Sequence, residues 1–404
     1  MFSRTLGFRV VSKDKPDCPS IATSSLSLPD DALIEILLRL PPHPACLIRA
    51  SSVCKHWHSI IVSHQFLCRF QLTHGAPMLG VFTNSTRIPR FLPVGVPSDC
   101  AAAAAAFSLP DLHWYVLSCR HSRILLAGAG WVQFLVLNPT NGHRQIIPVP
   151  HDLHHSYYHG HVPERNATVL CAAGHEDRGH CHSCPFFILC VFTVTYRYAY
   201  AIRYSSETRS WEKMSSSPVP CDVDNRPSVL VRNVLYWPLK SKYILAFDLG
   251  ACRLYYIECP PETHGVYRRN VHIMKTENGG LGLASMTIFS LRLWAQETDV
   301  EGVRGWMLCK VIELDNFLPL DKSILLSSNN HLGGRPPVRI LGLMEDDDLA
   351  FIWTTTGVFA VQLKSMQFKK VFEADISATV YPYKGFCISD SVGCDLTSED
   401  VGAE

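Results

Sequence analysis

The side chains best suited to bind a metal are histidines and cysteines crowded between positions 143 and 184. Nine of the nineteen histidines lie in this stretch. Its tightest group contains six residues, Cys171, His175, His180, Cys181, His182 and Cys184. Two thiolates spaced C-x-x-C, as Cys181 and Cys184 are, can share one tetrahedral zinc ion. Either His175 or His180, together with Cys171, would complete such a site.

A second interpretation of this group is a polar insertion between strands. No second C-x-x-C pair follows, and Cys184 leads directly into the apolar run Pro185–Val194. In this interpretation the histidines of Ala172–Ser183 are solvated and bind nothing. The sequence favours the insertion, leaves zinc open, and predicts no resident cofactor or metal.

Three further patterns are interpreted as ordinary turns or as no site. The acidic run Glu345–Asp348 lies between two apolar runs, which favours a hairpin turn with solvated charges over a cation site. The glycines at 279, 280 and 282 lack the strand–loop–helix context of a phosphate loop. No serine or cysteine has a recognisable base and orienting partner. We therefore expect no enzymatic activity.

Residues 26–61 hold more apolar surface than so short a segment can bury. A helix from Pro29 to Leu40 would carry two apolar stripes, and its stop is set by Pro41 and Pro42. The stripes are Leu33, Ile36, Leu37 and Leu40, and, further round, Ile34 and Leu38. A second helical stretch should run from Pro44 towards Val62 with a break at Ser51–Ser52. A unit of about 35–40 residues cannot cover both stripes, so we expect one to meet a partner.

This segment resembles an F-box. The residues that carry the resemblance are Leu28-Pro29-Asp30-Asp31, Leu33, Glu35-Ile36-Leu37, Arg39-Leu40-Pro41, Leu47, Val53-Cys54-Lys55 and Trp57. The resemblance implies a three-helix module that binds a Skp-type adaptor and so joins a cullin-RING ubiquitin ligase. The implied adaptor contacts are Leu28, Pro29, Leu33, Ile36, Leu37, Leu40, Pro41, Leu47, Val53, Cys54 and Trp57. His43-Pro44-Ala45 departs from the usual pattern, and an amphipathic hairpin of the main core is the alternative.

From about residue 75 the pattern changes to short β-rich runs separated by turn residues. Four segments resemble one another as strand, polar turn, strand: Phe134–Gly142, Ala201–Trp211, Ile244–Leu254 and Val358–Phe368. Recurring hairpins at intervals of tens of residues are typical of propeller blades. The length from Leu79 to Cys387 allows about six blades of roughly 50 residues each.

The same region resembles the C-terminal F-box-associated domain of a large plant family. The shared phrases include Ser205-Ser-Glu-Thr with Trp211, Val234-Leu-Tyr-Trp237, Leu281-Gly-Leu-Ala and Leu291-Arg-Leu-Trp294, and the likeness covers most of residues 110–385. It implies a β-propeller-like platform that recruits a protein for ubiquitination. We expect most of the tryptophans here to be blade-core residues, although their type also suits protein contacts.

Composition limits the remaining function classes. A net charge of +1 argues against a dedicated nucleic-acid partner. Sixteen cysteines are scattered without a disulfide framework or a signal peptide, which favours reduced thiols in cytosol or nucleus. Arg4 and Arg9, with no acid before Asp14, also fit a mitochondrial presequence, but the docking module that follows favours cytosol. The most apolar run, Phe186–Val194, is too short to cross a membrane.

Together these patterns predict an α+β multidomain chain, with a three-helix F-box followed by an all-β propeller-like domain. We expect a disordered segment over 1–24, the F-box over 25–68, the propeller over 75–388 and an acidic disordered tail over 389–404. The predicted function is that of a substrate-recognition subunit of a Skp-cullin-F-box ubiquitin ligase, with an unknown target protein. Two alternatives are open: an F-box protein that regulates or sequesters a partner without ubiquitination, and a metal- or glycan-binding propeller.

Overall fold

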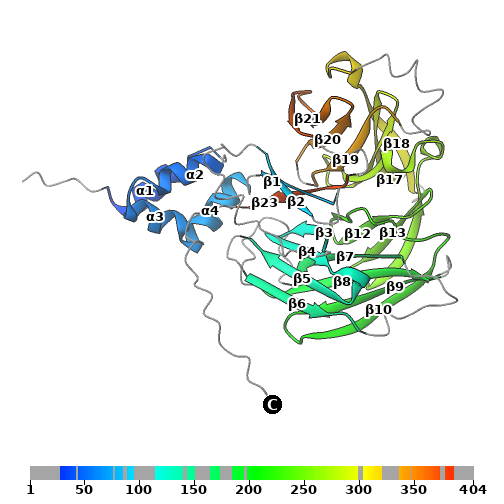
Figure 1. Cartoon of the computed structure of the whole chain (residues 1–404), viewed down its shortest axis with the longest axis horizontal. Coiled ribbons are helices and arrows are strands. Elements are labelled where there is room, and N and C mark those ends of the chain that lie inside the picture. The colour runs from blue at the N-terminus through cyan, green and yellow to red at the C-terminus, as the bar shows by residue number, and fades with distance from the viewer. Residues whose placement is uncertain are drawn as a thin grey trace, which may run out of the picture.

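A small helical unit and a ring of six β-sheets make up the computed structural model of this chain (Figure 1). The structure describes residues 28–41, 44–75, 78–84, 89–94, 114–139, 143–150, 164–172, 184–194, 198–298, 304–320, 336–345, 347–373 and 378–385. The predicted N-terminal segment and acidic tail lie outside these residues. So does most of the histidine-rich stretch.

The helical unit contains α1 (Asp30–Leu37), α2 (Pro44–Ser51), α3 (Lys55–Val62) and α4 (His64–His74). α1 ends at Leu37 rather than Leu40, because Leu38 already serves as its C-cap. The break expected at Ser51–Ser52 is confirmed, since α2 ends there. Cys54 then starts α3, its Sγ accepting a hydrogen bond from the backbone N–H of Trp57 at 3.4 Å.

A fourth helix, α4, adds to the three that were expected and completes the unit. Its Phe66 and Phe70 are fully buried and share a core with Leu37 of α1 and Ile61 of α3. A helix carrying two apolar stripes needs this extra cover, since three short helices enclose too little volume. Both aromatic side chains lie one helical turn apart in the sequence, so the pattern for α4 was present but was not interpreted.

Five sheets of the ring have four strands each, and the sixth has three. Blade I holds β3 (Tyr115–Arg120), β4 (Arg123–Ala127), β5 (Gln133–Asn138) and β6 (His143–Pro148). Blade II holds β7 (Glu164–Cys171), β8 (Phe186–Val194), β9 (Tyr198–Ser205) and β10 (Ser210–Pro218). Blade III holds β11 (Val229–Val231), β12 (Val234–Pro238), β13 (Tyr243–Asp248) and β14 (Arg253–Glu258).

The ring continues through two more four-stranded blades to a mixed sheet. Blade IV holds β15 (Val271–Lys275), β16 (Leu281–Thr287), β17 (Ser290–Thr298) and β18 (Arg304–Glu313). Blade V holds β19 (Arg339–Leu343), β20 (Leu349–Thr354), β21 (Gly357–Gln362) and β22 (Phe368–Phe372). Blade VI joins β23 (Val380–Lys384) to β1 (Met78–Thr83) and β2 (Arg90–Pro93). Six blades and a propeller fold were both predicted and are confirmed.

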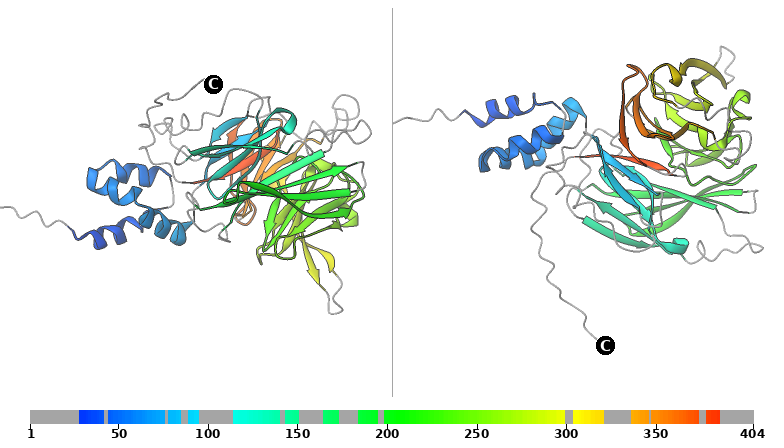
Figure 2. Two further views of the ribbon diagram at one scale, coloured as in Figure 1. Left: turned by 90° about the horizontal axis from the view of Figure 1, so that it is seen from below. Right: turned by 45° about the horizontal axis from the view of Figure 1, so that its top comes forward.

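Blade VI closes the ring by pairing the two ends of the propeller. β1 and β23 are antiparallel, with Thr83 opposite Val380 and Met78 opposite Lys384. The three views place this sheet next to the helical unit (Figures 1 and 2). Gly80 sits where β1 meets β2, and a Cβ there would lie 2.4 Å from the carbonyl oxygen of Leu92. The pairing of β1 with β2 in this closing sheet therefore depends on a glycine at this position.

The four hairpins recognised in the sequence are the outer strand pairs of blades I, II, III and V. In blades III and II, the polar residue that opens the turn also caps it. Asp248 Oδ1 accepts hydrogen bonds from the backbone N–H of Gly250 and Ala251, both at 2.9 Å. Ser205 Oγ accepts one from Glu207 at 3.3 Å. The turn in blade II then places Arg209 in the left-handed region, at φ 52°.

Apolar cores lie between neighbouring blades, as in other propellers. One core joins blades I and II through Phe134, Ile147 and Ile188, all of them buried. Trp114, Trp237 and Trp294 are buried in such cores, and the other four tryptophans of the propeller pack against cores while half-buried, which confirms the interpretation of most tryptophans as packing residues. Polar clamps add to the cores. Asn166 Nδ2 on β7, for example, donates to the carbonyl oxygens of Asp224 and Arg226 at 2.9 and 2.7 Å.

Arg120 crosses the axis of the ring. From the end of β3 in blade I, its guanidinium pairs with the carboxylate of Glu345 in blade V. It also donates to the carbonyl oxygen of Ser228 in blade III at 2.8 Å. Glu345 and Asp347 lie between β19 and β20, where a hairpin turn was predicted, but the prediction of solvated charges is wrong for Glu345. Glu345 faces a buried arginine, and Asp347 pairs with Lys384 at 2.8 Å.

Candidate functional site

Exposed apolar side chains gather on the helical unit at positions expected to meet a partner. Leu28 is 52% exposed, Ile36 is 50% exposed and Val53 is 61% exposed. Leu28 precedes α1, Ile36 lies near its end, and Val53 lies between α2 and α3. Apolar side chains this open gain free energy when a partner covers them, so they define the candidate docking surface.

The structure divides the eleven predicted contact residues into three groups. Leu33, Leu37 and Leu47 are buried in the helical core, at 6%, 1% and 3% exposure. Leu40 and Trp57 are half-buried against that core. The remaining residues are exposed: Leu28, Pro29, Ile36, Pro41, Val53 and Cys54. The buried leucines therefore stabilise the helical unit, while the exposed group supplies the apolar area that a partner can cover.

Polar contacts from α3 and α4 fix α1. At its start, Asp30 Oδ1 lies 3.0 Å from Nε2 of His56. On another face, Glu35 pairs with Arg69. At its end, the backbone carbonyl of Leu38 meets Nε2 of His74 at 2.6 Å. These exposed pairs add little stability each, but together they set the direction of α1 and so of Ile36.

The histidine–cysteine group is brought together only in part. Cys171 ends β7 and is buried, and Cys184 lies half-buried just before β8. The other four members fall outside the described residues, so the zinc hypothesis remains a prediction. In the part of the chain that the structure describes, no three histidine, cysteine or acidic side chains are arranged to hold a metal. Burial raises the pKa of Cys190 and Cys259 to about 12, which keeps both as thiols.

Buried charge lies around the propeller axis. Burial alone would raise the pKa of Asp224, but Arg226 and Arg268 outweigh it and hold this pKa below its usual value. Burial, followed by Arg226 and Arg339, lowers the pKa of His272 to about 3. His272 is therefore neutral at physiological pH. These groups link blades III, IV and V, and no sequence pattern indicated them.

The fold and this surface define a protein built from an F-box and a β-propeller. An F-box domain matches residues 25–69, which contain all four helices except the end of α4. The family described as F-box protein AT5G49610-like, beta-propeller, matches residues 115–384. This match spans more than half of the chain, so the chain belongs to that family. The propeller occupies the middle of the chain, which corrects the expectation of a C-terminal domain.

One curated relative is the F-box/kelch-repeat protein At3g61590 of Arabidopsis thaliana. The two sequences are 43% identical over 63 residues, which is 16% of this chain and 15% of that protein. The match thus spans far less than two thirds of the relative. A plant origin is suggested by these names alone.

Solved structures with partial likeness include three other proteins. BBS1N in complex with ARL6DN is 10% identical, and the match covers 71% of this chain and 74% of that chain, with a TM-score of 0.35. Hsv2 of Kluyveromyces lactis is 11% identical, with 63% of this chain and 62% of that chain covered and a TM-score of 0.35. Apo AztD from Citrobacter koseri is 10% identical, with 74% of this chain and 78% of that chain covered and a TM-score of 0.34. Likeness at this level adds nothing on function. Among the described helices, none has both the length and the apolar character needed to span a membrane.

Proposed function

We propose that this protein is a non-catalytic substrate receptor of a Skp-cullin-F-box ubiquitin ligase. The helical unit would bind a Skp-type adaptor, and the propeller would hold a target protein. The observation that carries the proposal is the exposed apolar group Leu28, Ile36 and Val53 on a unit whose own core is already filled. F-box domains generally bind Skp-type adaptors, and the match to residues 25–69 supports the same partner here.

The exposed group supplies a useful share of a binding free energy. Burying a whole leucine, isoleucine or valine side chain contributes about 1.5–3 kcal/mol. Because each of the three is about half exposed in the unbound chain, covering all three contributes roughly 3–4 kcal/mol. The rest must come from other contacts, which suits an interface with a few dominant residues.

Catalysis in such a complex is positional. The receptor would keep the target's lysines near a ligase-bound conjugating enzyme and so raise their effective concentration. Neither domain needs an acid, a base or a nucleophile for that role. The buried thiols and the neutral His272 described above fit a structural role for these groups.

A pair of isoleucine substitutions in the full chain tests the proposal. Ile36→Asp removes apolar contact and places a carboxylate against the adaptor, so we expect at least 30-fold weaker adaptor binding, from about 2 kcal/mol or more. Ile288→Asp is the matched control, since Ile288 is 55% exposed in a turn of blade IV. Calorimetric titration with purified adaptor measures both. Equal affinity for the two variants would refute the proposed surface.

A further inference from the structure

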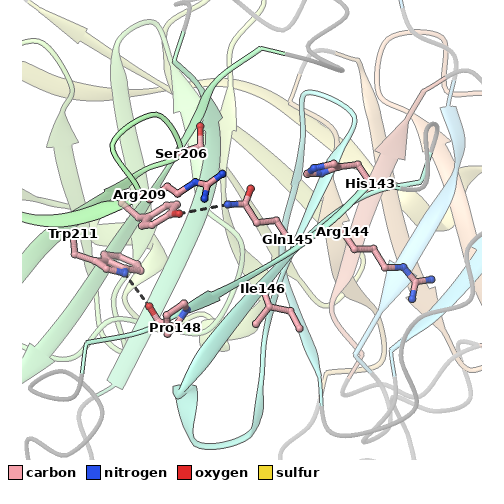
Figure 3. A pocket seen from close by; sticks show the side chains of 9 residues that line it. His143, Arg144, Gln145, Ile146, Pro148, Ser206, Arg209 and Trp211 are labelled. Carbon is pink, nitrogen blue, oxygen red and sulfur yellow. Dashed lines mark hydrogen bonds between the residues drawn. The ribbon is translucent and has the colours of Figure 1, made fainter. Parts of the chain in front are cut away.

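A hollow of about 530 Å³ lies on the side of the propeller between blades I and II (Figure 3). One wall of the hollow is β6, the last strand of blade I, and the other wall is the hairpin of β9 and β10 in blade II. The proposed function assigns no role to this place. It also contains Trp211, which belongs to a phrase recognised in the sequence.

The lining of this hollow favours negative charge. Nine residues line it, and they include Arg144, Arg209 and His143 but no aspartate or glutamate. Glu207 lies in the same turn without lining the hollow, and Glu212 is paired with Arg203. Among the residues that the structure describes, no carboxylate lies within ion-pair distance of the Arg209 guanidinium. A ligand carboxylate would therefore find an arginine available.

The walls are held in place before any ligand arrives. Trp211 Nε1 donates a hydrogen bond to the carbonyl oxygen of Pro148 at 3.0 Å, joining the two blades (Figure 3). Its ring packs against Phe134 and Tyr204, with centroids 6.0 and 5.4 Å away. Arg209 is itself the turn residue with φ 52°, so the turn between β9 and β10 sets where its side chain starts. A rigid wall loses little entropy on binding, which favours affinity.

β6 offers an extended ligand a matching edge. Among the described strands it pairs with β5 alone, so it is the outermost strand of its blade. Ile147 is buried in the core shared with blade II, so Gln145 and His143 share that face, and Arg144 and Ile146 lie on the other. Ile146 is 61% exposed. Strands whose outer edge is accessible can add a strand from a partner.

We propose that this hollow binds an extended acidic segment of the target protein as an added strand beside β6. Acidic side chains on the ligand face towards blade II would meet Arg209, and an apolar side chain on the opposite face would cover Ile146. The proposal rests on the proposed function, because it names the chemistry of the target that the propeller holds.

The test uses the full chain and a fluorescein-labelled octapeptide of six glutamates and two valines. Fluorescence anisotropy should show saturable binding with a dissociation constant below about 1 mM at low salt, weakening as salt rises. Arg209→Glu should weaken binding at least tenfold. The matched control is Arg253→Glu, an exposed arginine next to the equivalent turn of blade III, which should leave the affinity unchanged.

Three results with the designed peptides would overturn this inference. They are the absence of binding by the acidic peptide, equal affinity of the wild type and Arg209→Glu, and equal affinity for the same peptide with lysine in place of glutamate. Tenfold tighter binding of a synthetic peptide of residues 389–404 would also overturn it, since the occupant would then be the chain's own acidic end. Adaptor titration of Arg209→Glu separates the two proposals: retained adaptor affinity with lost peptide binding leaves the proposed function standing.

Discussion

Neutralising one partner of the axial ion pair should destabilise the propeller measurably. Arg120 is buried and its guanidinium pairs with Glu345, whose side chain is 21% exposed. Glu345→Gln leaves the arginine charge buried beside a neutral amide. Breaking a fully buried pair costs about 3–5 kcal/mol, and the partial exposure of Glu345 reduces this to about 2–3 kcal/mol.

Urea unfolding of the full chain, followed by tryptophan fluorescence, is a suitable assay because Trp237 and Trp294 are buried in blade cores. For a domain of roughly 300 residues, a loss of about 2–3 kcal/mol corresponds to a drop in Tm of about 3–5 °C. The matched control is Glu212→Gln, which breaks an exposed glutamate–arginine pair and should cost about 0–1 kcal/mol.

A double-mutant cycle then isolates the pair itself. Arg120→Met alone should also destabilise, because it leaves Glu345 facing a buried site and removes the donor to the carbonyl of Ser228. Arg120→Met combined with Glu345→Gln should cost less than the sum of the two, with a coupling free energy of about 1–3 kcal/mol. A coupling within about 0.5 kcal/mol of zero would refute the assignment of this contact as a bridge across the axis.

Two further predictions concern pH and ring closure. The pKa of His272 is lowered to about 3 by burial and by Arg226 and Arg339, whereas in the unfolded chain it is near 6.5, so the unfolded state binds the proton first. The contribution of neutral His272 to the free energy of unfolding is thus fully present above pH 6.5 and is lost as pH falls, by about 1–2 kcal/mol at pH 5 for this half-buried ring. Urea titrations at pH 7 and 5 should show this loss in the wild type and not in His272→Gln. Gly80→Ala should destabilise by about 1–3 kcal/mol, because its Cβ would clash with the backbone of β2. Gly305→Ala, where nothing lies within 4 Å, should change thermal stability little, and equal Tm values for both variants would contradict the closure argument.

Local patterns predicted the blades because each blade repeats the same hairpin. In blades II and III, the residue before the outer turn, Ser205 or Asp248, can satisfy turn N–H groups with its own side chain, and both do so. Ring closure could not be predicted from such local patterns. Asn84 on the β1 side and Tyr381 on β23 are joined across 297 residues, and no local periodicity reports such a pairing.

The candidate docking surface was predicted as a segment but not residue by residue. Helical spacing placed Leu33, Ile36 and Leu37 on one stripe, yet two are buried and Ile36 is exposed. The direction of the core was set by α4, which the sequence interpretation omitted. The link between Arg120 and Glu345 joins residues 225 positions apart, so the acidic run was taken for a solvated turn.

The most direct test of the account is affinity purification from cells in which the proteasome is inhibited, with wild type and Ile36→Asp compared. The wild type should retain a Skp-type adaptor, a cullin and further proteins held by the propeller. Ile36→Asp should lose the adaptor and the cullin but keep those further proteins, whose half-lives, measured in cells without the inhibitor, should lengthen. Adaptor retained by Ile36→Asp would contradict the account of the docking surface. Retained partners whose half-lives do not change would contradict the role in ubiquitination.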